Sequence, residues 1–316
     1  MTIKQQWINY IHLLQDNICA ALEKEDGKAT FIEDIWVRPE GGGGKTRVIA
    51  NGGVFEKGGV NTSAVEGVVT DAMRHQLKLP AQIEGKEYAW FACGLSLVLH
   101  PSNPFVPTVH CNYRMFELYE LSSPEGGQEG AVVDRWFGGG TDLTPYYLIN
   151  EDAVHFHGTY KKVCDQFDGS FYPSFKKHCD DYFVNLHRNN ERRGIGGIFY
   201  DYQRPSAEKG VDFWMNFGKG CGNAFIEAYI PIVARRKDMP YTAEHKHWQE
   251  IRRGRYTEFN LVHDRGTLFG LKTNGRIESI LMSLPPTVRF EYNYQPIAGS
   301  EEDKLLQACL NPPEWL

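Results

Sequence analysis

Polar side chains that could perform chemistry recur at positions of one parity in two stretches near the middle of the 316-residue chain. Ser96 and His100 belong to the first stretch, and His110, Asn112 and Arg114 belong to the second. An arginine offers a planar fork suited to a carboxylate, an amide can orient a ligand, and an imidazole exchanges protons near neutral pH. These residue types predict an anion-binding site with acid–base capacity.

Both stretches are expected to be β-strands. Residues 95–99 and 109–118 are apolar and β-prone, and three prolines between them exclude a helix there. Because side chains alternate across a strand, the five polar groups would share one face of a sheet. An ordinary solvated sheet face would show the same alternation. The residue types favour a ligand site, since each unpaired buried polar group costs about 1–3 kcal/mol.

Two glycine runs add candidate features. Glycines 138–140 could let the backbone approach a ligand closely, and Asp142 follows them. The Asp142 carboxylate could orient a ligand N–H, or it could make a turn with Thr144 and Pro145, which is the commoner use. The run at residues 41–44 is predicted to be a flexible loop. It is not a phosphate-binding loop, because Pro39 stands where the first glycine of that motif belongs.

Composition narrows the class of protein. A net charge of −6 gives no reason to expect a nucleic acid or an anionic membrane as partner. The seven cysteines are scattered without a Cys-x-x-Cys pair, which is typical of a reducing compartment. No apolar run reaches the roughly 18 residues of a membrane span, and the first residues resemble neither a signal nor a transit peptide. A cytoplasmic protein is therefore expected.

The remaining patterns predict an α+β protein. Helices are expected at residues 3–26, 173–193, 225–236 and 301–310, and another is expected to begin near Ser206. Strands are expected at residues 31–37, 132–137 and 198–202, and a hairpin is expected around Asn51-Gly52. Residues 256–281 are predicted to be a strand meander carrying Arg265 and Arg276. We expect one large antiparallel sheet, flanked by helices on both faces, in a single domain over residues 1–316.

Longer segments resemble the oxygen-dependent coproporphyrinogen-III oxidases of haem biosynthesis. They run in family order from about residue 41 to the end, and together they are very specific. The matching segments are His100-Pro-Ser-Asn-Pro-Phe-Val-Pro-Thr-Val-His110-Cys-Asn112-Tyr-Arg114, Trp136-Phe-Gly-Gly-Gly-Thr-Asp142-Leu-Thr-Pro, Glu151-Asp-Ala-Val-His155-Phe-His157, Glu191-Arg-Arg-Gly-Ile-Gly-Gly-Ile, and Arg252-Arg-Gly-Arg-Tyr through Ser279-Ile-Leu-Met-Ser-Leu-Pro-Pro.

The resemblance implies a fold, a partner and a reaction. The fold would be a flat antiparallel sheet flanked by helices, and the partner a second copy of the chain. The dimer interface is expected to include residues 252–276. In the implied reaction, oxygen drives the oxidative decarboxylation of two propionates of coproporphyrinogen-III to vinyls. The products would be protoporphyrinogen-IX, CO₂ and H₂O₂, with oxygen as co-substrate and no cofactor.

The resemblance also implies roles for individual residues. His110 corresponds to the proposed proton donor, and Asp142 and Arg265 match residues implicated in activity. Substrate-binding positions correspond to Ser96, Asn112, Tyr113, Arg114, Asn274, Gly275 and Arg276. Asn274 departs from the glycine or serine expected there. Because the substrate carries four carboxylates and four pyrrole N–H groups, the arginines would bind its arms and Asp142 would accept an N–H.

Two alternatives stay open at this point. A metal-dependent oxidase could use four imidazoles, which suit Zn²⁺, Mn²⁺ or Fe²⁺, although no His-x₃-His pair or cysteine cluster supports it. These imidazoles belong to His100, His110, His157 and His187. A non-catalytic tetrapyrrole carrier would also explain basic clefts and glycine loops, and it predicts binding without oxygen consumption.

Overall fold

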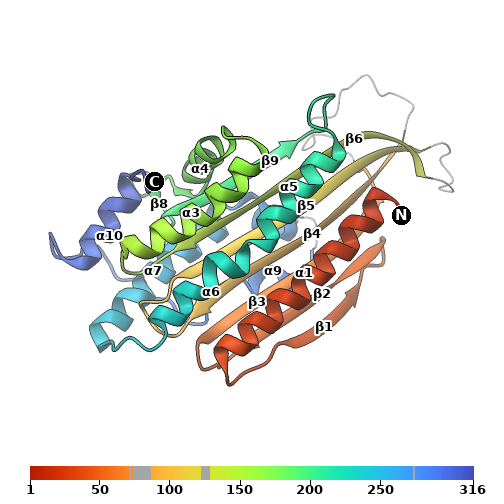
Figure 1. Cartoon of the computed structure of the whole chain (residues 1–316). Helices are drawn as coiled ribbons and strands as arrows, with labels where there is room; N and C mark the ends of the chain where they lie inside the picture. Colours follow the sequence, from red (N-terminus) through yellow and green to blue (C-terminus); the bar gives the residue numbers. More distant parts are fainter. Residues whose placement is uncertain (71–72, 74–86, 122–128, 273–274) are drawn as a thin grey trace.

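A seven-stranded antiparallel sheet organises the computed structural model, which describes residues 1–70, 73, 87–121, 129–272 and 275–316. The strand order is β1-β2-β3-β4-β5-β6-β9, so only the step from β6 to β9 skips part of the chain (Figure 1). The strands are β1 Ile32–Val37, β2 Gly42–Ala50, β3 Phe55–Val68, β4 Tyr88–Pro101, β5 Thr108–Leu121, β6 Glu129–Thr144 and β9 Gly196–Gln203. A separate short hairpin pairs β7 Val184–Asn185 with β8 Glu191–Arg192.

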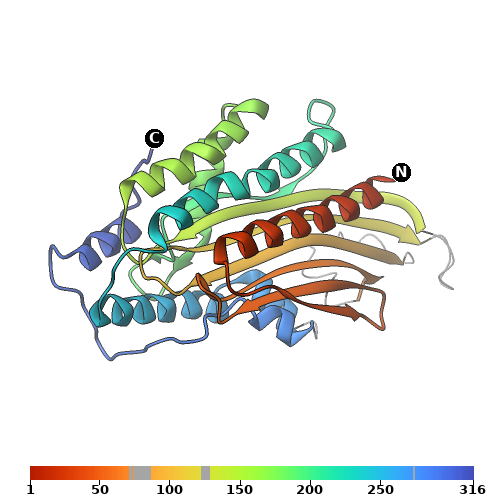
Figure 2. The same cartoon turned by 60° about the horizontal axis from the view of Figure 1, so that its bottom comes forward.

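Helices lie on both faces of this sheet, which confirms the predicted α+β fold. Helices α1, α3, α5 and α6 lie on one face, and α7, α8 and α9 lie on the other (Figure 2). The helices are α1 Ile3–Asp26, α3 Asn150–Phe167, α4 Phe171–Tyr182, α5 Val211–Asn223, α6 Phe225–Arg236, α7 Ala243–Val262, α8 Arg265–Lys272, α9 Ile277–Leu281 and α10 Glu301–Leu310. No helix in the described part of the chain is long and apolar enough to cross a membrane.

The hydrophobic core lies between the sheet and the first group of helices. Leu95, Leu97 and Leu99 of β4 are at most 1% exposed, as the alternation predicted. Burying a leucine side chain contributes about 1.5–3 kcal/mol. Trp7 of α1 packs edge-on against Phe137 of β6 at 5.7 Å and donates its indole N–H to a carbonyl of β4. The core therefore fixes one face of the central strands and leaves the opposite face for polar groups.

Local signals located the N-terminal elements correctly. Helix α1 begins after Thr2, whose hydroxyl accepts the Gln5 N–H, and ends at Gly27 in the left-handed conformation at φ 69°. The hairpin between β2 and β3 turns at Asn51, which has φ 56°. Asparagine tolerates this conformation because its short polar side chain bonds locally. Both the predicted helix and the predicted hairpin are confirmed.

The glycine runs lie within strands, so the prediction of a loop at residues 41–44 is wrong. Gly42 begins β2 at φ 78°, and a Cβ there would lie 2.1 Å from the Ala64 carbonyl oxygen of β3. Glycines 138–140 are likewise paired with β5 inside β6. A Cβ on Gly139 would lie 2.7 Å from the Tyr113 ring. These glycines allow the sheet to pack closely, a role that composition alone does not distinguish from a loop.

The predicted helix over residues 173–193 ends eleven residues early, at Tyr182. The chain then forms the β7–β8 hairpin, whose turn contains Asn189 and Asn190 at positive φ. Asp180 of this helix is buried and accepts a hydrogen bond from Lys176. The apolar stripe continued past the true end because Phe183 packs into a separate aromatic cluster. Periodicity does not register that change of direction.

The predicted meander at residues 256–281 is also wrong, because this region forms α7, α8 and α9. Helix α7 is buried almost all round its central turns, so no polar face marks it as a helix. Its buried arginines are paired with glutamates, including Arg252 with Glu191 and Arg253 with Glu56. Residues 252–257 are buried within the single folded chain, so they cannot form the predicted dimer surface. The homodimer itself stays a prediction.

We predict that thiol reagents do not label the seven cysteines of the folded protein. All seven are free and buried, and burial raises the pKa of each thiol, for example to about 12 for Cys19 and about 11 for Cys309. The reactive thiolate is therefore scarce near neutral pH. A chromogenic disulfide should report seven thiols in guanidinium and almost none before unfolding. Rapid labelling of the folded chain would contradict this burial.

Candidate active site

The sheet face opposite the core carries the predicted polar row. In β5, His110, Asn112 and Arg114 alternate with fully buried residues and are themselves partly exposed. Across to β4, Asn112 lies opposite Ser96. Across to β6, His110 lies opposite Asp142. The expectation that these residues share one face is confirmed by this register.

A buried chain of three charged or ionisable groups begins at His110. Its Nδ1 is 2.7 Å from Oδ1 of Asp142, and Oδ2 of Asp142 accepts a hydrogen bond of 2.7 Å from Nη2 of Arg193. The side chains of Asp142 and Arg193 are 3% and 2% exposed, whereas that of His110 is 14% exposed. The histidine is therefore the member of this chain that meets the open face.

Aromatic rings hold Arg193 in place. Its guanidinium lies 4.1 Å from the Phe183 ring centroid, 4.7 Å from that of Tyr256 and 5.0 Å from that of Phe259. Its Nη1 donates to Asn260 of α7. Burial is the largest single effect and lowers the pKa of this guanidinium, but the charge and hydrogen bond of Asp142, together with Tyr256 and Asp264, raise this pKa overall. The cation is thus permanently charged beside Asp142.

Asp142 is ionised and fixes the tautomer of His110. Burial opposes its ionisation, but the Arg193 charge and the His110 hydrogen bond outweigh burial and lower the pKa of this carboxyl. A carboxylate can only accept, so Nδ1 of His110 donates to it and Nε2 remains available for proton exchange. Because both Asp142 oxygens already accept hydrogen bonds, the contacts favour a positioning role over the direct N–H contact that the sequence suggested.

Arg114 and Arg265 meet at one acid that the sequence interpretation did not single out. Nη1 of Arg114 donates to Oδ1 of Asn112 at 2.6 Å. Nη2 of Arg114 lies 2.9 Å from Oδ1 of Asp201 in β9, and Nη2 of Arg265 lies 3.7 Å from Oδ2 of the same carboxylate. The structure therefore brings two of the three predicted carboxylate-binding arginines together.

A cavity of about 340 Å³ opens beside this pair. Its lining residues are His178, Asp181, Tyr182, Phe199, Asp201 and Arg265. Tyr182 and Phe199 stack in parallel with centroids 4.5 Å apart, and the Arg265 guanidinium lies over the Tyr182 ring. An apolar wall with a few charged groups is typical of a ligand site. The volume suits part of a large ligand, such as one acidic arm.

The third predicted arginine, Arg276, lies near the β1 edge of the sheet. Arg276 donates to Oδ2 of Asp34 on the edge strand β1 and to Ser279 of α9. Gly275 donates its N–H to the Gly270 carbonyl. Asn274 lies outside the described residues. Arg276 is therefore placed about four strands away from Arg114 in the strand order, a separation that a large ligand would span.

Tyr113, a predicted substrate-binding position, has its side chain on the opposite face from its neighbours Asn112 and Arg114. Its parity directs it to the core face, where its hydroxyl bonds Thr141 and the residue is fully buried. Because neighbouring strand residues face opposite ways, the Tyr113 side chain is directed away from the polar face. Its assignment as a substrate-binding position stays a prediction.

The four histidines of the metal alternative have different partners. His100 bonds Thr108 and the Ser283 carbonyl, whereas His157 bonds Tyr172 and the Ile195 carbonyl. His187 lies in the β7–β8 turn against His263 and Glu258. Across the described ranges, no three His, Cys, Asp or Glu side chains are grouped so that they could hold a metal ion. The geometry thus does not support a shared metal site for these four residues.

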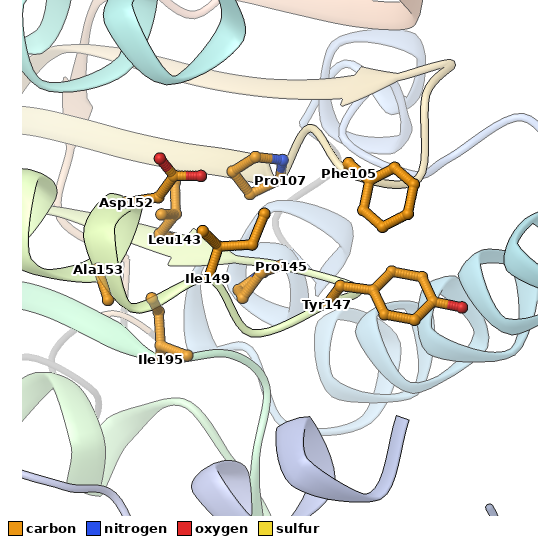
Figure 3. A pocket seen from close by; sticks show the side chains of 9 residues that line it. All are labelled: Phe105, Pro107, Leu143, Pro145, Tyr147, Ile149, Asp152, Ala153 and Ile195. Atoms are coloured by element: carbon orange, nitrogen blue, oxygen red, sulfur yellow. The ribbon is translucent and has the colours of Figure 1, made fainter. Parts of the chain in front are cut away.

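A second cavity, at the far end of β6, has a volume of only about 10 Å³. Figure 3 shows its mostly apolar lining, in which Phe105, Leu143 and Ile149 surround the space. The Asp152 carboxylate on its wall is already bonded to Arg235 and Arg236. This space has room for about one water molecule. It offers no site for a substrate.

Sequence reasoning missed Arg193, Asp201 and Asp34 as members of the site. Arg193 belongs to the family segment that begins at Glu191, but the helical pattern predicts it at the end of a helix. Asp201 shares the parity of Phe199 in the predicted strand, so alternation could have placed it on the polar face. Asp34 offered no signal, because its contact with Arg276 joins residues far apart in the chain.

The fold and the site together define a class of protein. It is an enzyme-like α+β protein whose open sheet face carries a histidine–aspartate dyad beside arginines suited to carboxylates. The sequence model of the coproporphyrinogen III oxidase family matches residues 6–315. The oxygen-dependent coproporphyrinogen-III oxidase, chloroplastic, of Glycine max is 52% identical over 316 residues, covering all of this chain and 80% of the relative. The corresponding enzyme of Hordeum vulgare is 53% identical, and the match covers all of this chain and 80% of that relative. The one of Nicotiana tabacum is 54% identical, and the match covers 96% of this chain and 75% of that relative. The chain belongs to the coproporphyrinogen III oxidase family.

We predict that Asp142→Asn lowers the free energy of unfolding at pH 7 by about 3–5 kcal/mol, because it leaves the buried Arg193 charge uncompensated. The folded-state pKa of Asp142 lies below its usual value. The contribution of ionised Asp142 to the free energy of unfolding is thus complete above the usual carboxyl pKa of about 4. This contribution is lost as the pH falls through the pKa of Asp142 in the folded protein. Urea unfolding of both proteins should show a gap that narrows as the pH falls below ~4.

The control is Asp181→Asn. Asp181 is an exposed residue paired with Lys177 one helical turn away, and its loss should change stability by less than about 1 kcal/mol. A gap between wild type and Asp142→Asn that does not narrow below pH ~4 would contradict the assigned charge state of Asp142.

Proposed function

We propose that this chain catalyses the oxygen-dependent oxidative decarboxylation of two propionates of coproporphyrinogen-III to vinyls, giving protoporphyrinogen-IX, CO₂ and H₂O₂. The observation that carries the proposal is the His110–Asp142 dyad beside Asn112 and Arg114 on one sheet face. Family membership supports the same reaction, since the named relatives are oxygen-dependent coproporphyrinogen-III oxidases.

The arginines are suited to bind the acidic arms. Arg114 and Arg265 are grouped at Asp201, and Arg276 lies towards the edge strand β1. Each charge-assisted hydrogen bond to a carboxylate contributes about 1.5–3 kcal/mol. Binding at separated points would hold a macrocycle flat over the central strands, with Ser96 and Asn112 beneath it. Gly275 and Asn274 stay proposed substrate-binding positions next to Arg276 in the sequence.

His110 is the group placed to move a proton. In each of the two rounds a propionate loses its carboxylate as CO₂ and a hydrogen from the carbon attached to the pyrrole ring, which releases two electrons and one proton. O₂ takes up these two electrons, that proton and a second proton from the medium to form H₂O₂. Nε2 of His110 would exchange the proton, and Asp142 would keep the ring oriented and stabilise the imidazolium. The atoms and electrons balance with oxygen and protons alone, so we propose that no further cofactor takes part.

Partner, compartment and domain follow as proposals. We propose a homodimer, with its interface outside the buried part of α7, and one catalytic domain over residues 1–316. The buried free cysteines suit a reducing compartment such as the cytoplasm. The named relatives are chloroplastic, so fractionation of the source cells would decide between these two locations.

The reaction can be tested directly. Purified protein is incubated with coproporphyrinogen-III with and without air, and vinyl product, peroxide and oxygen consumption are followed. We expect product only with oxygen, and unchanged rates after exhaustive chelation. Tight binding without oxygen consumption would support the carrier alternative and overturn the enzymatic proposal. Loss of activity on chelation that returns with one metal ion would overturn the proposal that no cofactor takes part.

We predict that His110→Ala lowers kcat by about 10²–10⁴-fold and changes KM only slightly, because proton transfer is lost while the arginines still bind the carboxylates. Steady-state kinetics with coproporphyrinogen-III measures both parameters. His187→Ala is the matched control, since His187 lies in the exposed β7–β8 turn, and it should keep wild-type kcat. A wild-type kcat in His110→Ala would remove the role assigned to His110.

A further inference from the structure

Asp201 joins two arginines that come from distant parts of the chain. Arg114 belongs to β5 and Arg265 to the start of α8, and each guanidinium approaches a different oxygen of the Asp201 carboxylate, at 2.9 Å and 3.7 Å. The side chain of Asp201 is 14% exposed, whereas those of Arg114 and Arg265 are 31% and 59% exposed. The acid therefore lies beneath the pair, and the arginines face the solvent.

The backbone around Asp201 is arranged to aim its side chain. The β6–β9 ladder shifts register between Phe137 and Gly139, and irregularities of this kind redirect side chains near functional sites. Tyr202 has φ 53°, which is rare for a residue with a large side chain. Its N–H donates to Oδ1 of Asp201 at 3.0 Å. A Cβ on Gly138 would lie 2.8 Å from the same oxygen, so the glycine leaves the space that the carboxylate fills.

The charges around Asp201 leave the pair of arginines with excess positive charge. Two guanidinium groups share one carboxylate, and among the described residues the further hydrogen bond of Arg114 goes to the neutral amide of Asn112. Asp181, the other acid on the cavity wall, pairs with Lys177. The Arg265 guanidinium lies 4.7 Å from the Tyr182 ring centroid, and that of Arg114 lies 5.8 Å from the Trp136 ring centroid. Their remaining N–H donors can therefore receive one more anion.

We propose that Asp201 is a positioning residue that holds Arg114 and Arg265 together as a two-arginine grip on a single carboxylate arm of the substrate. This inference rests on the proposed function and deepens it. Without the acid, the two cations repel each other and the exposed Arg265 is free to leave the site. With it, they are organised before the ligand arrives, which lowers the ordering cost of binding. The adjoining cavity of about 340 Å³ gives the arm space.

The test compares Asp201→Asn with wild type in two assays. With coproporphyrinogen-III, we expect KM to rise about tenfold while kcat stays within about twofold. With oxidised coproporphyrin-III, which cannot react, fluorescence titration should show a similar loss of affinity. A purely structural role would instead lower the melting temperature and the active fraction, and the KM of the remaining folded enzyme would not move.

The matched control is Asp134→Asn. Asp134, on the neighbouring strand β6, forms an ion pair with Arg204, so its replacement should leave KM and kcat unchanged. Arg265→Gln is a second variant, which alters only an exposed side chain. It should weaken porphyrin binding several-fold and reduce its dependence on salt. If Asp201→Asn does not fold, an unchanged affinity in Arg265→Gln still overturns the inference.

The possible failures are distinguishable. If wild type converts the substrate but Asp201→Asn keeps wild-type KM, the grip is wrong and the proposed function stands. If wild type does not convert coproporphyrinogen-III, the proposed function fails. The porphyrin titration then decides on the grip alone: weaker binding by Asp201→Asn supports it, and equal binding overturns it.

Discussion

The buried pair of Asp142 and Arg193 is the interaction on which the site depends. It joins strand β6 to the segment after β8, and α7 covers it through Asn260, Tyr256 and Phe259. Two opposite charges at this depth are tolerated because each satisfies the other and because further hydrogen bonds and aromatic rings surround them. The pair keeps Asp142 ionised, and the ionised Asp142 in turn sets the tautomer and direction of His110.

The sheet gives this chemistry a rigid floor. Its core face is packed by α1, α3, α5 and α6 (Figure 2), so the strands cannot tilt without disturbing that packing. Because the strands alternate, rigidity on one face fixes the position of polar groups on the other. Glycines within β2 and β6 let neighbouring strands and side chains approach closely. The separate arginine groups at Asp201 and Asp34 are thereby held at defined points across one surface.

Several expectations depended on local signals and were correct for that reason. Thr2, Gly27 and Asn51 act through their own backbone, so the first helix and the first hairpin could be found by inspection. The predicted secondary structure was wrong where the buried surface of an element did not follow the 3.6-residue period of a helix. Helix α7 carries paired arginines inside the protein, and without a polar face it resembled a strand. The helix expected to reach Arg193 ended at Tyr182, because Phe183 joins a cluster made by other elements.

The sequence by itself determined the antiparallel α+β class, the parity that groups His110, Asn112 and Arg114, and a specific family likeness. The class and the parity follow from residue spacing along the chain, which is a local property. The family likeness follows from the order of residues within short segments, which is also local. Only the tertiary structure decided that Tyr113 faces the core, that Asp142 acts on His110 beside Arg193, and that Asp201 gathers two arginines. Such contacts join residues separated by tens of positions. They depend on how strands register and helices cross, which no local pattern encodes.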